Sequence, residues 1–77
     1  MSERELTFGE RAVGLTFNPS GDPIVLALKK AMAEFIDICH DRIEDYPDDP
    51  EAVRMYKIAI TEAQTAQMWA VKAATWR

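Results

Sequence analysis

The chain has 77 residues, of which 48% are hydrophobic, and a net charge of −4. This is enough for one small domain, whose core supplies roughly 3–5 kcal/mol of net stability unless a disulfide, a metal or a partner chain adds more. The single cysteine excludes an internal disulfide, the single histidine leaves too few ligands for structural zinc, and the net charge disfavours a general duplex-binding protein. We therefore expect a homo-oligomer that holds no metal.

The first residues are polar and carry both signs of charge, so they do not resemble a signal peptide. Next, Thr7 and Glu10 fit a capping box, which predicts a short helix at about 8–13. Residues 14–21 contain two turn-forming pairs, Asn18-Pro19 and Ser20-Gly21, and predict an ordered loop.

Two Asp-Pro pairs then mark the starts of two long helices, because Asp caps a helix well and proline suits its first position. Asp22-Pro23 predicts a helix over about 22–46, and Asp49-Pro50 predicts one over about 50–75. The connection between them is short, so they should be antiparallel neighbours. The expected fold is all-α, a single helical-hairpin domain over residues 1–77, in which a short N-terminal helix precedes a long antiparallel hairpin.

The apolar residues of the long helices form more faces than a hairpin can bury, judged at 100° per residue. We expect one stripe of each helix in the seam: Ile24, Leu28, Ala31, Phe35, Ile38, Cys39 and Tyr46 on the first, and Tyr56, Ala59, Ala63, Ala66, Ala70 and Ala74 on the second. Two groups are left over: Val25, Met32, Ile36 and Ile43, and Met55, Ile58 and Trp69. We expect the short helix to cover one group and another protomer to cover the other.

Charge is unevenly spread along the chain. Residues 34–51 hold eight acids and one base, a net of −7, whereas the remaining residues hold five acids and eight bases, a net of +3. Arg54, Lys57 and Thr61 also share the polar face of the second long helix, where they could bind phosphate. The alternative interpretations are a solvated acidic turn and a solvated polar face.

No arrangement of residues predicts catalysis. Cys39 and His40 are adjacent in a helix, so their side chains diverge by about 100°. The acids that could resemble a metal cluster lack the spacing of a calcium-binding EF-hand loop: Asp37, Asp41, Glu44 and Asp45. We therefore expect a binding protein without a cofactor, a catalytic residue or a metal ligand.

Two segments resemble a known family. The first is Glu10-Arg-Ala-Val-Gly-Leu-Thr-Phe-Asn-Pro-Ser-Gly-Asp22, followed by a helix that carries Lys29. The second is Arg54-x-x-Lys57-x-Ala-x-Thr61, which runs into Ala66-Gln-Met-Trp-Ala70. This order is similar to the phage anti-CBASS cyclic-nucleotide sponge proteins and to the hairpin domain that they share with the Thoeris anti-defence family.

The resemblance implies a homohexamer that binds cyclic dinucleotides, and in some members cyclic trinucleotides, without cleaving them. A tyrosine in the family's first loop stacks on a base and a basic residue meets a phosphate; Phe17 and Lys29 take those places here. The implied cyclic-dinucleotide site comprises Phe17, Asn18, Pro19, Ser20, Gly21 and Lys29, and the implied second nucleotide site comprises Arg54, Lys57 and Thr61.

The function implied is immune evasion. By sequestering the second messenger in the cytoplasm of an infected or lysogenic bacterial host, such a protein would keep CBASS anti-phage effectors inactive. Two alternatives stay open: a sponge for a cyclic ADP-ribose-type Thoeris signal, and a helical-hairpin adaptor that binds another protein.

Overall fold

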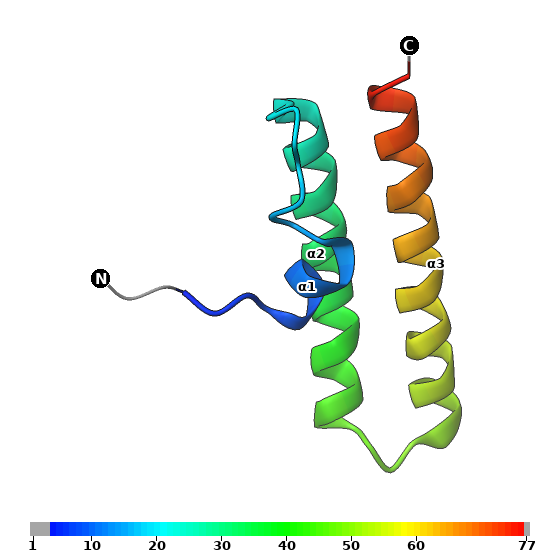
Figure 1. The fold of residues 1–77 in the computed structure, drawn as a ribbon. Helices are drawn as coiled ribbons and strands as arrows, with labels where there is room; N and C mark the ends of the chain where they lie inside the picture. The colour runs from blue at the N-terminus through cyan, green and yellow to red at the C-terminus, as the bar shows by residue number, and fades with distance from the viewer. Residues whose placement is uncertain (1–3, 77) are drawn as a thin grey trace.

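The computed structural model describes residues 4–76, in which three α-helices and no strand occur. They are α1 (Phe8–Val13), α2 (Pro23–Asp45) and α3 (Pro50–Ala74). Figure 1 shows α2 and α3 side by side and antiparallel, with α1 lying against the middle of α2. The prediction of an all-α fold is confirmed. None of the described helices is long and apolar enough to span a membrane.

Local signals in the sequence set where each helix begins. Thr7 caps α1 through the predicted capping box: its hydroxyl accepts the Glu10 N–H at 3.0 Å, and the Glu10 carboxylate accepts the Thr7 N–H at 2.9 Å. Asp22 caps α2 by accepting the Ile24 N–H, and Asp49 caps α3 by accepting the Ala52 N–H. Each cap satisfies a backbone donor that has no partner within its helix.

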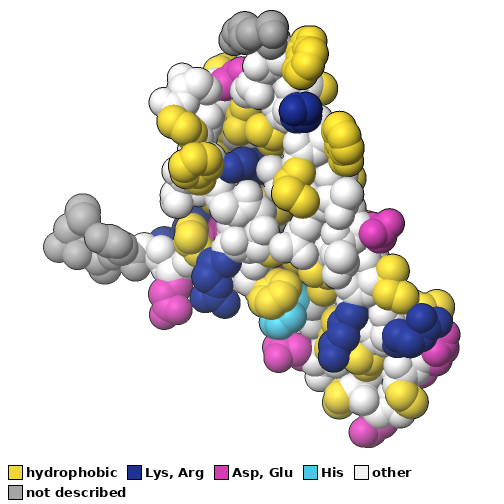
Figure 2. All heavy atoms as spheres, turned by 45° about the vertical axis from the view of Figure 1, so that its right-hand side comes forward, with side chains coloured by type: hydrophobic (Ala, Val, Ile, Leu, Met, Phe, Trp, Pro, Cys, Tyr) yellow, Lys and Arg dark blue, Asp and Glu magenta, His cyan; other side chains and the backbone are white. Residues whose placement is uncertain are grey.

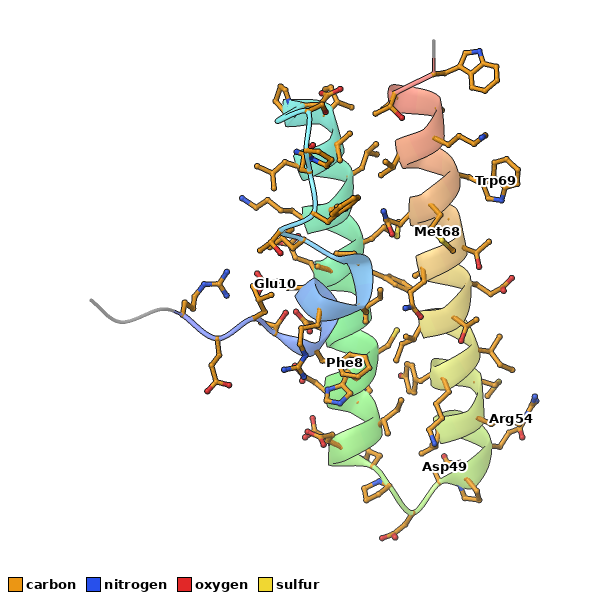
Figure 3. The ribbon with its side chains drawn as sticks, in the orientation of Figure 1. Phe8, Glu10, Asp49, Arg54, Met68 and Trp69 are labelled. Atoms are coloured by element: carbon orange, nitrogen blue, oxygen red, sulfur yellow. The ribbon has the colours of Figure 1, made fainter. Side chains whose placement is uncertain are left out.

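Helix α1 approaches α2 closely because residue 9 is glycine. A Cβ atom at Gly9 would collide with the backbone carbonyl of Ala33. The Gly9 N–H instead donates to the Asp37 carboxylate at 2.7 Å, which fixes the start of α1 on α2. One residue earlier, the Phe8 ring stacks on the His40 imidazole with 4.1 Å between ring centroids. Figure 3 shows Phe8 against α2 at this junction.

The face that α2 presents to the core differs from the predicted one. Ile36 is fully buried and Val25 nearly so, whereas Ile38 of the predicted seam is 63% exposed. The physical reason is that α2 packs against α1 as well as α3, which turns its buried face toward α1. Of the predicted seam, Ile24, Ala31, Phe35, Ile38 and Tyr46 are exposed, Leu28 is half-buried and Cys39 is buried. The group that was expected to flank the seam, Val25, Met32, Ile36 and Ile43, is buried or packed against the core.

The predicted seam of α3 is largely correct. Ala63 is buried, whereas Ala66 is exposed; Ile60 and Gln67 are buried although they were not in the predicted stripe. The remaining members of that stripe, Tyr56, Ala59, Ala70 and Ala74, are half-buried. The side chain of Gln64 donates to the Ala12 carbonyl at 3.2 Å and so ties α3 to α1.

Substitution of Gly9 tests the close contact between α1 and α2. We expect Gly9→Ala to lower the free energy of unfolding by about 1–3 kcal/mol, because the added methyl group forces the helices apart. Arg11→Ala, at an exposed position of the same helix, should change it by less than about 0.5 kcal/mol. Urea unfolding of the three proteins at one protein concentration measures this, and equal stability of Gly9→Ala and the parent protein would contradict the contact.

Candidate functional site

Part of what holds the loop between α1 and α2 is a set of hydrogen bonds among its own residues. Gly14 ends α1 in the left-handed conformation, at φ 64°, which a glycine adopts without strain. Its carbonyl accepts the Phe17 N–H at 2.9 Å and closes a turn. Further on, the Asn18 side chain donates to the Asp22 carbonyl, and the Gly21 N–H donates to the Asn18 carbonyl. The loop therefore reaches the start of α2 in a defined conformation.

Lys29 lies beneath this loop. Its side chain leaves the buried face of α2, and the residue is only 5% exposed. The ammonium donates to the Gly14 carbonyl at 2.9 Å and to the Phe17 carbonyl at 2.6 Å. It also lies 5.5 Å from the centroid of the Phe17 ring, which is itself 73% exposed. One buried cation thus holds the loop that presents an exposed aromatic ring.

The loop, the start of α2 and the end of α3 line an open cavity of about 530 Å³. This volume falls within the range of small-molecule sites. Figure 2 shows hydrophobic side chains gathered around this end of the hairpin, away from the turn, with Lys or Arg side chains among them. The cavity is lined by Phe17, Asn18, Pro19, Ser20, Val25, Lys29, Val71 and Thr75. Five of the six residues implied for the cyclic-dinucleotide site line it; Gly21 does not.

Within residues 4–76, no carboxylate lies within ion-pairing distance of the Lys29 ammonium. The ion pairs of this part of the chain are Arg4–Glu10 and Arg54–Glu51. Lysines are rarely buried without a partner of opposite charge, because burial removes the water that stabilises the cation. Two carbonyl dipoles offset part of that cost, and an ammonium has a third N–H to donate. The site is therefore chemically suited to an anion.

The residues of the second implied site lie far from this cavity. Arg54 is one turn into α3, and at 1.5 Å per residue it is about 25 Å along the helix from Val71, which lines the cavity. Its guanidinium pairs with Glu51 at 2.7 Å, and this hydrogen bond lowers the pKa of the Glu51 carboxyl. Figure 3 shows Arg54 pointing away from α2.

Lys57 and Thr61 lie on the same face of α3 as Arg54, but nearer to α1 along the helix. They line a second cavity, of about 390 Å³, together with Phe8 and His40 of the junction between α1 and α2. The Thr61 hydroxyl donates to the Lys57 carbonyl at 3.2 Å, so one turn of α3 presents both residues. Within one protomer, Arg54 does not line this cavity.

Cys39 and His40 were the residues considered for catalysis, and each has a different environment. Cys39 is buried, and burial raises the pKa of its thiol, which disfavours the reactive thiolate. The ring of its neighbour His40 stacks on Phe8. Among residues 4–76, no group of three His, Cys, Asp or Glu side chains is arranged to hold a metal ion.

Sequence reasoning missed three residues of the first cavity, Val25, Val71 and Thr75. Val25 had been placed on a flanking stripe, and no motif distinguishes the other two. The predicted antiparallel arrangement could have indicated these residues, because it places the end of the second long helix beside the start of the first. The Thr75 hydroxyl donates to the Val71 carbonyl at 2.8 Å, so this wall of the cavity offers mainly apolar surface.

Comparison with protein-family models gives a match over residues 10–75 to the hairpin domain of Acb2/Tad1. The matched region contains the loop, Lys29 and almost all of the hairpin. The chain belongs to this family. The family is an anti-defence family, and the resemblance stated from the sequence is therefore confirmed. Curated proteins and solved structures give no significant match.

The environment of Cys39 leads to a test of its reactivity. Because the thiol is buried and its pKa is raised, we expect a thiol-specific reagent such as Ellman's reagent to react much more slowly with the native protein than with the protein in urea at the same pH. Absorbance of the released thiolate gives both rates. Equally fast reaction in the two states would mean that Cys39 is accessible and could act as a nucleophile.

Proposed function

We propose that the protein binds and sequesters cyclic dinucleotides without cleaving them, and so prevents activation of CBASS anti-phage effectors in the cytoplasm of an infected or lysogenic host. Membership of an anti-defence family supports a role of this kind. The observation that carries the proposal is the buried Lys29 ammonium, which has no counter-ion within residues 4–76 and adjoins a cavity. A phosphate group would supply the missing negative charge.

The same cavity offers a base-stacking surface. The Phe17 ring lines the cavity and is exposed to solvent. Stacking of a base on an aromatic ring contributes roughly 1–3 kcal/mol to binding. Phenylalanine has no hydroxyl, so this contact depends on ring overlap and carries no hydrogen bond. Asn18 and Ser20 line the cavity beside the ring and supply polar groups for the ligand. One ligand with a base and a phosphate could therefore use the ring and the ammonium together.

We also propose that Arg54, Lys57 and Thr61 form a second nucleotide site, which takes a cyclic trinucleotide. Arg54 is paired with Glu51 and does not line the cavity of Lys57 and Thr61. We propose that several protomers contribute to this site, so that cations from neighbouring chains join those of one helix face.

Such a site requires a homo-oligomer, which we propose to be a homohexamer. Met55, Ile58 and Trp69, the surplus apolar group of the sequence, are exposed in the single chain, and Trp69 is 68% exposed. Figure 3 shows Trp69 pointing away from α2. We call these three residues the α3 patch. Burial of a large apolar side chain contributes about 1.5–3 kcal/mol, so covering the patch would stabilise an assembly.

The oligomer prediction is tested by molar mass in solution. We expect light scattering to give a multiple of the 8.7 kDa protomer, near six, at micromolar concentration. Ile58→Glu should shift the protein toward smaller species, because it places a charge in the α3 patch. Lys30→Glu, at an exposed position of α2 outside the patch, should leave the mass unchanged. An 8.7 kDa monomer for the parent protein would refute the proposed assembly.

Ligand class is tested by thermal shift with cyclic dinucleotides, cyclic trinucleotides, cyclic ADP-ribose derivatives and linear dinucleotides. A ligand at 100 times its Kd should stabilise the protein by about 2.7 kcal/mol and raise its Tm. We expect cyclic dinucleotides to do so, and to be recovered intact after denaturation of the complex. Stabilisation by cyclic ADP-ribose derivatives alone would indicate the Thoeris signal, and no response to any nucleotide would favour an adaptor.

Calorimetry on variants separates the two proposed sites. Phe17→Ala should weaken cyclic-dinucleotide binding by roughly 1–3 kcal/mol and leave trinucleotide binding nearly unchanged, since it removes the stacking ring. Arg54→Ala should do the reverse. Phe35→Ala, which removes an exposed ring from α2 outside both cavities, is the matched control. Loss of both ligands in either site variant, with the oligomer intact, would show that the two sites are one.

A further inference from the structure

The Lys29 ammonium forms two of its possible hydrogen bonds within the protein. Both acceptors are carbonyls of the loop, those of Gly14 and Phe17, at 2.9 and 2.6 Å. The Gly14 carbonyl also accepts the Phe17 N–H, so the ammonium binds both ends of the turn that carries the aromatic ring. A side chain that served only as a ligand contact would not need these bonds.

We propose that Lys29 is a positioning residue, whose ammonium holds the turn from Gly14 to Phe17 and so presets the Phe17 ring before a ligand arrives. The inference rests on the proposed function for the identity of the ligand, but the clamp itself is a property of the free protein. Within residues 4–76 the ammonium has two acceptors, and the phosphate contact would use its third N–H. One residue thus couples the base-stacking contact to the phosphate contact.

The surroundings of the turn explain why a clamp is needed. Phe17 is 73% exposed and makes few contacts that could fix its ring. Gly14, at the start of the turn, can adopt many backbone conformations and so does not fix the turn by itself. Lys29 in contrast projects from the middle of the buried face of α2 and is 5% exposed, so its stem is fixed by the core. Hydrogen bonds from a charged donor are about twice as strong as neutral ones. The rigid helix therefore orders the loop through the ammonium.

Presetting the ring has a consequence for affinity. A loop that had to become ordered on binding would oppose association with its own loss of conformational freedom, whereas a loop that is ordered beforehand does not. Lys29 and Phe17 should therefore act as one unit. Their substitutions should be non-additive, since removing the ammonium also removes most of what the ring contributes.

Hydrogen exchange in the ligand-free protein tests the clamp directly. We compare the parent protein with Lys29→Met and with Lys30→Met, which makes the same change of charge at the exposed neighbouring residue. In Lys29→Met, the Phe17 amide should exchange about tenfold faster or more, which is the loss expected for a charged hydrogen bond. Amides of Ile36 and Ile60 in the core should keep their rates, and Lys30→Met should match the parent. Should Lys29→Met fail to fold, Lys29→Leu, which also lacks a donor, takes its place.

A double-mutant cycle tests the effect of the clamp on ligand binding. The probe is 3′,3′-cyclic GMP–AMP, measured by calorimetry on Phe17→Ala, Lys29→Met and the double variant. The clamp predicts that the double variant loses clearly less affinity than the product of the two single losses. Additive losses together with an unchanged Phe17 exchange rate would overturn the inference and leave Lys29 as a phosphate contact only. If no cyclic dinucleotide binds the parent protein, the proposed function fails, and the exchange rates still decide the clamp.

Discussion

The burial of one ammonium group beneath the loop is the constraint on which the site depends. Lys29 takes a position on α2 that an apolar residue would ordinarily occupy, between Val25 and Ala33 on the buried face. A cation there requires partners, and the carbonyls of Gly14 and Phe17 supply them. The loop, the end of α1 and the start of α2 are thereby held together by one charged group, and the cavity opens beside it.

How far the sequence predicts this fold depends on the range of the interactions involved. The caps at Thr7, Asp22 and Asp49 were predictable because each involves residues two or three positions apart. The buried face of α2 was not predictable in this way, because it depends on where α1 packs. The position of α1 is fixed by the contact between Gly9 and Ala33, 24 positions further along the chain. Periodicity detects an apolar stripe but cannot choose between two stripes of similar strength.

The candidate site shows the same division. Phe17 and Lys29 came from a motif, and they line one cavity with Asn18, Pro19 and Ser20. What the motif could not give is the way Lys29 uses its donors, since a buried lysine bound to loop carbonyls and an exposed lysine look alike in a sequence. Gly21 lies outside the lining because its role is in the backbone: at φ 67° it turns the chain toward the start of α2.

The distribution of charge gives the two ends of the hairpin different character. Most of the acidic stretch, residues 34–51, lies in the second half of α2 and around the turn, whereas the cavity lies at the opposite end and has no acidic residue in its lining. An anionic ligand would therefore be repelled from the turn and drawn toward the cavity, over a range set by a Debye length of about 8 Å at physiological salt. Near the turn, an anion that binds Arg54 would compete with the Glu51 carboxylate, and further cations beside Arg54 would favour the anion. Assembly of several protomers would supply such cations, which links the proposed second site to the α3 patch through electrostatics as well as through packing.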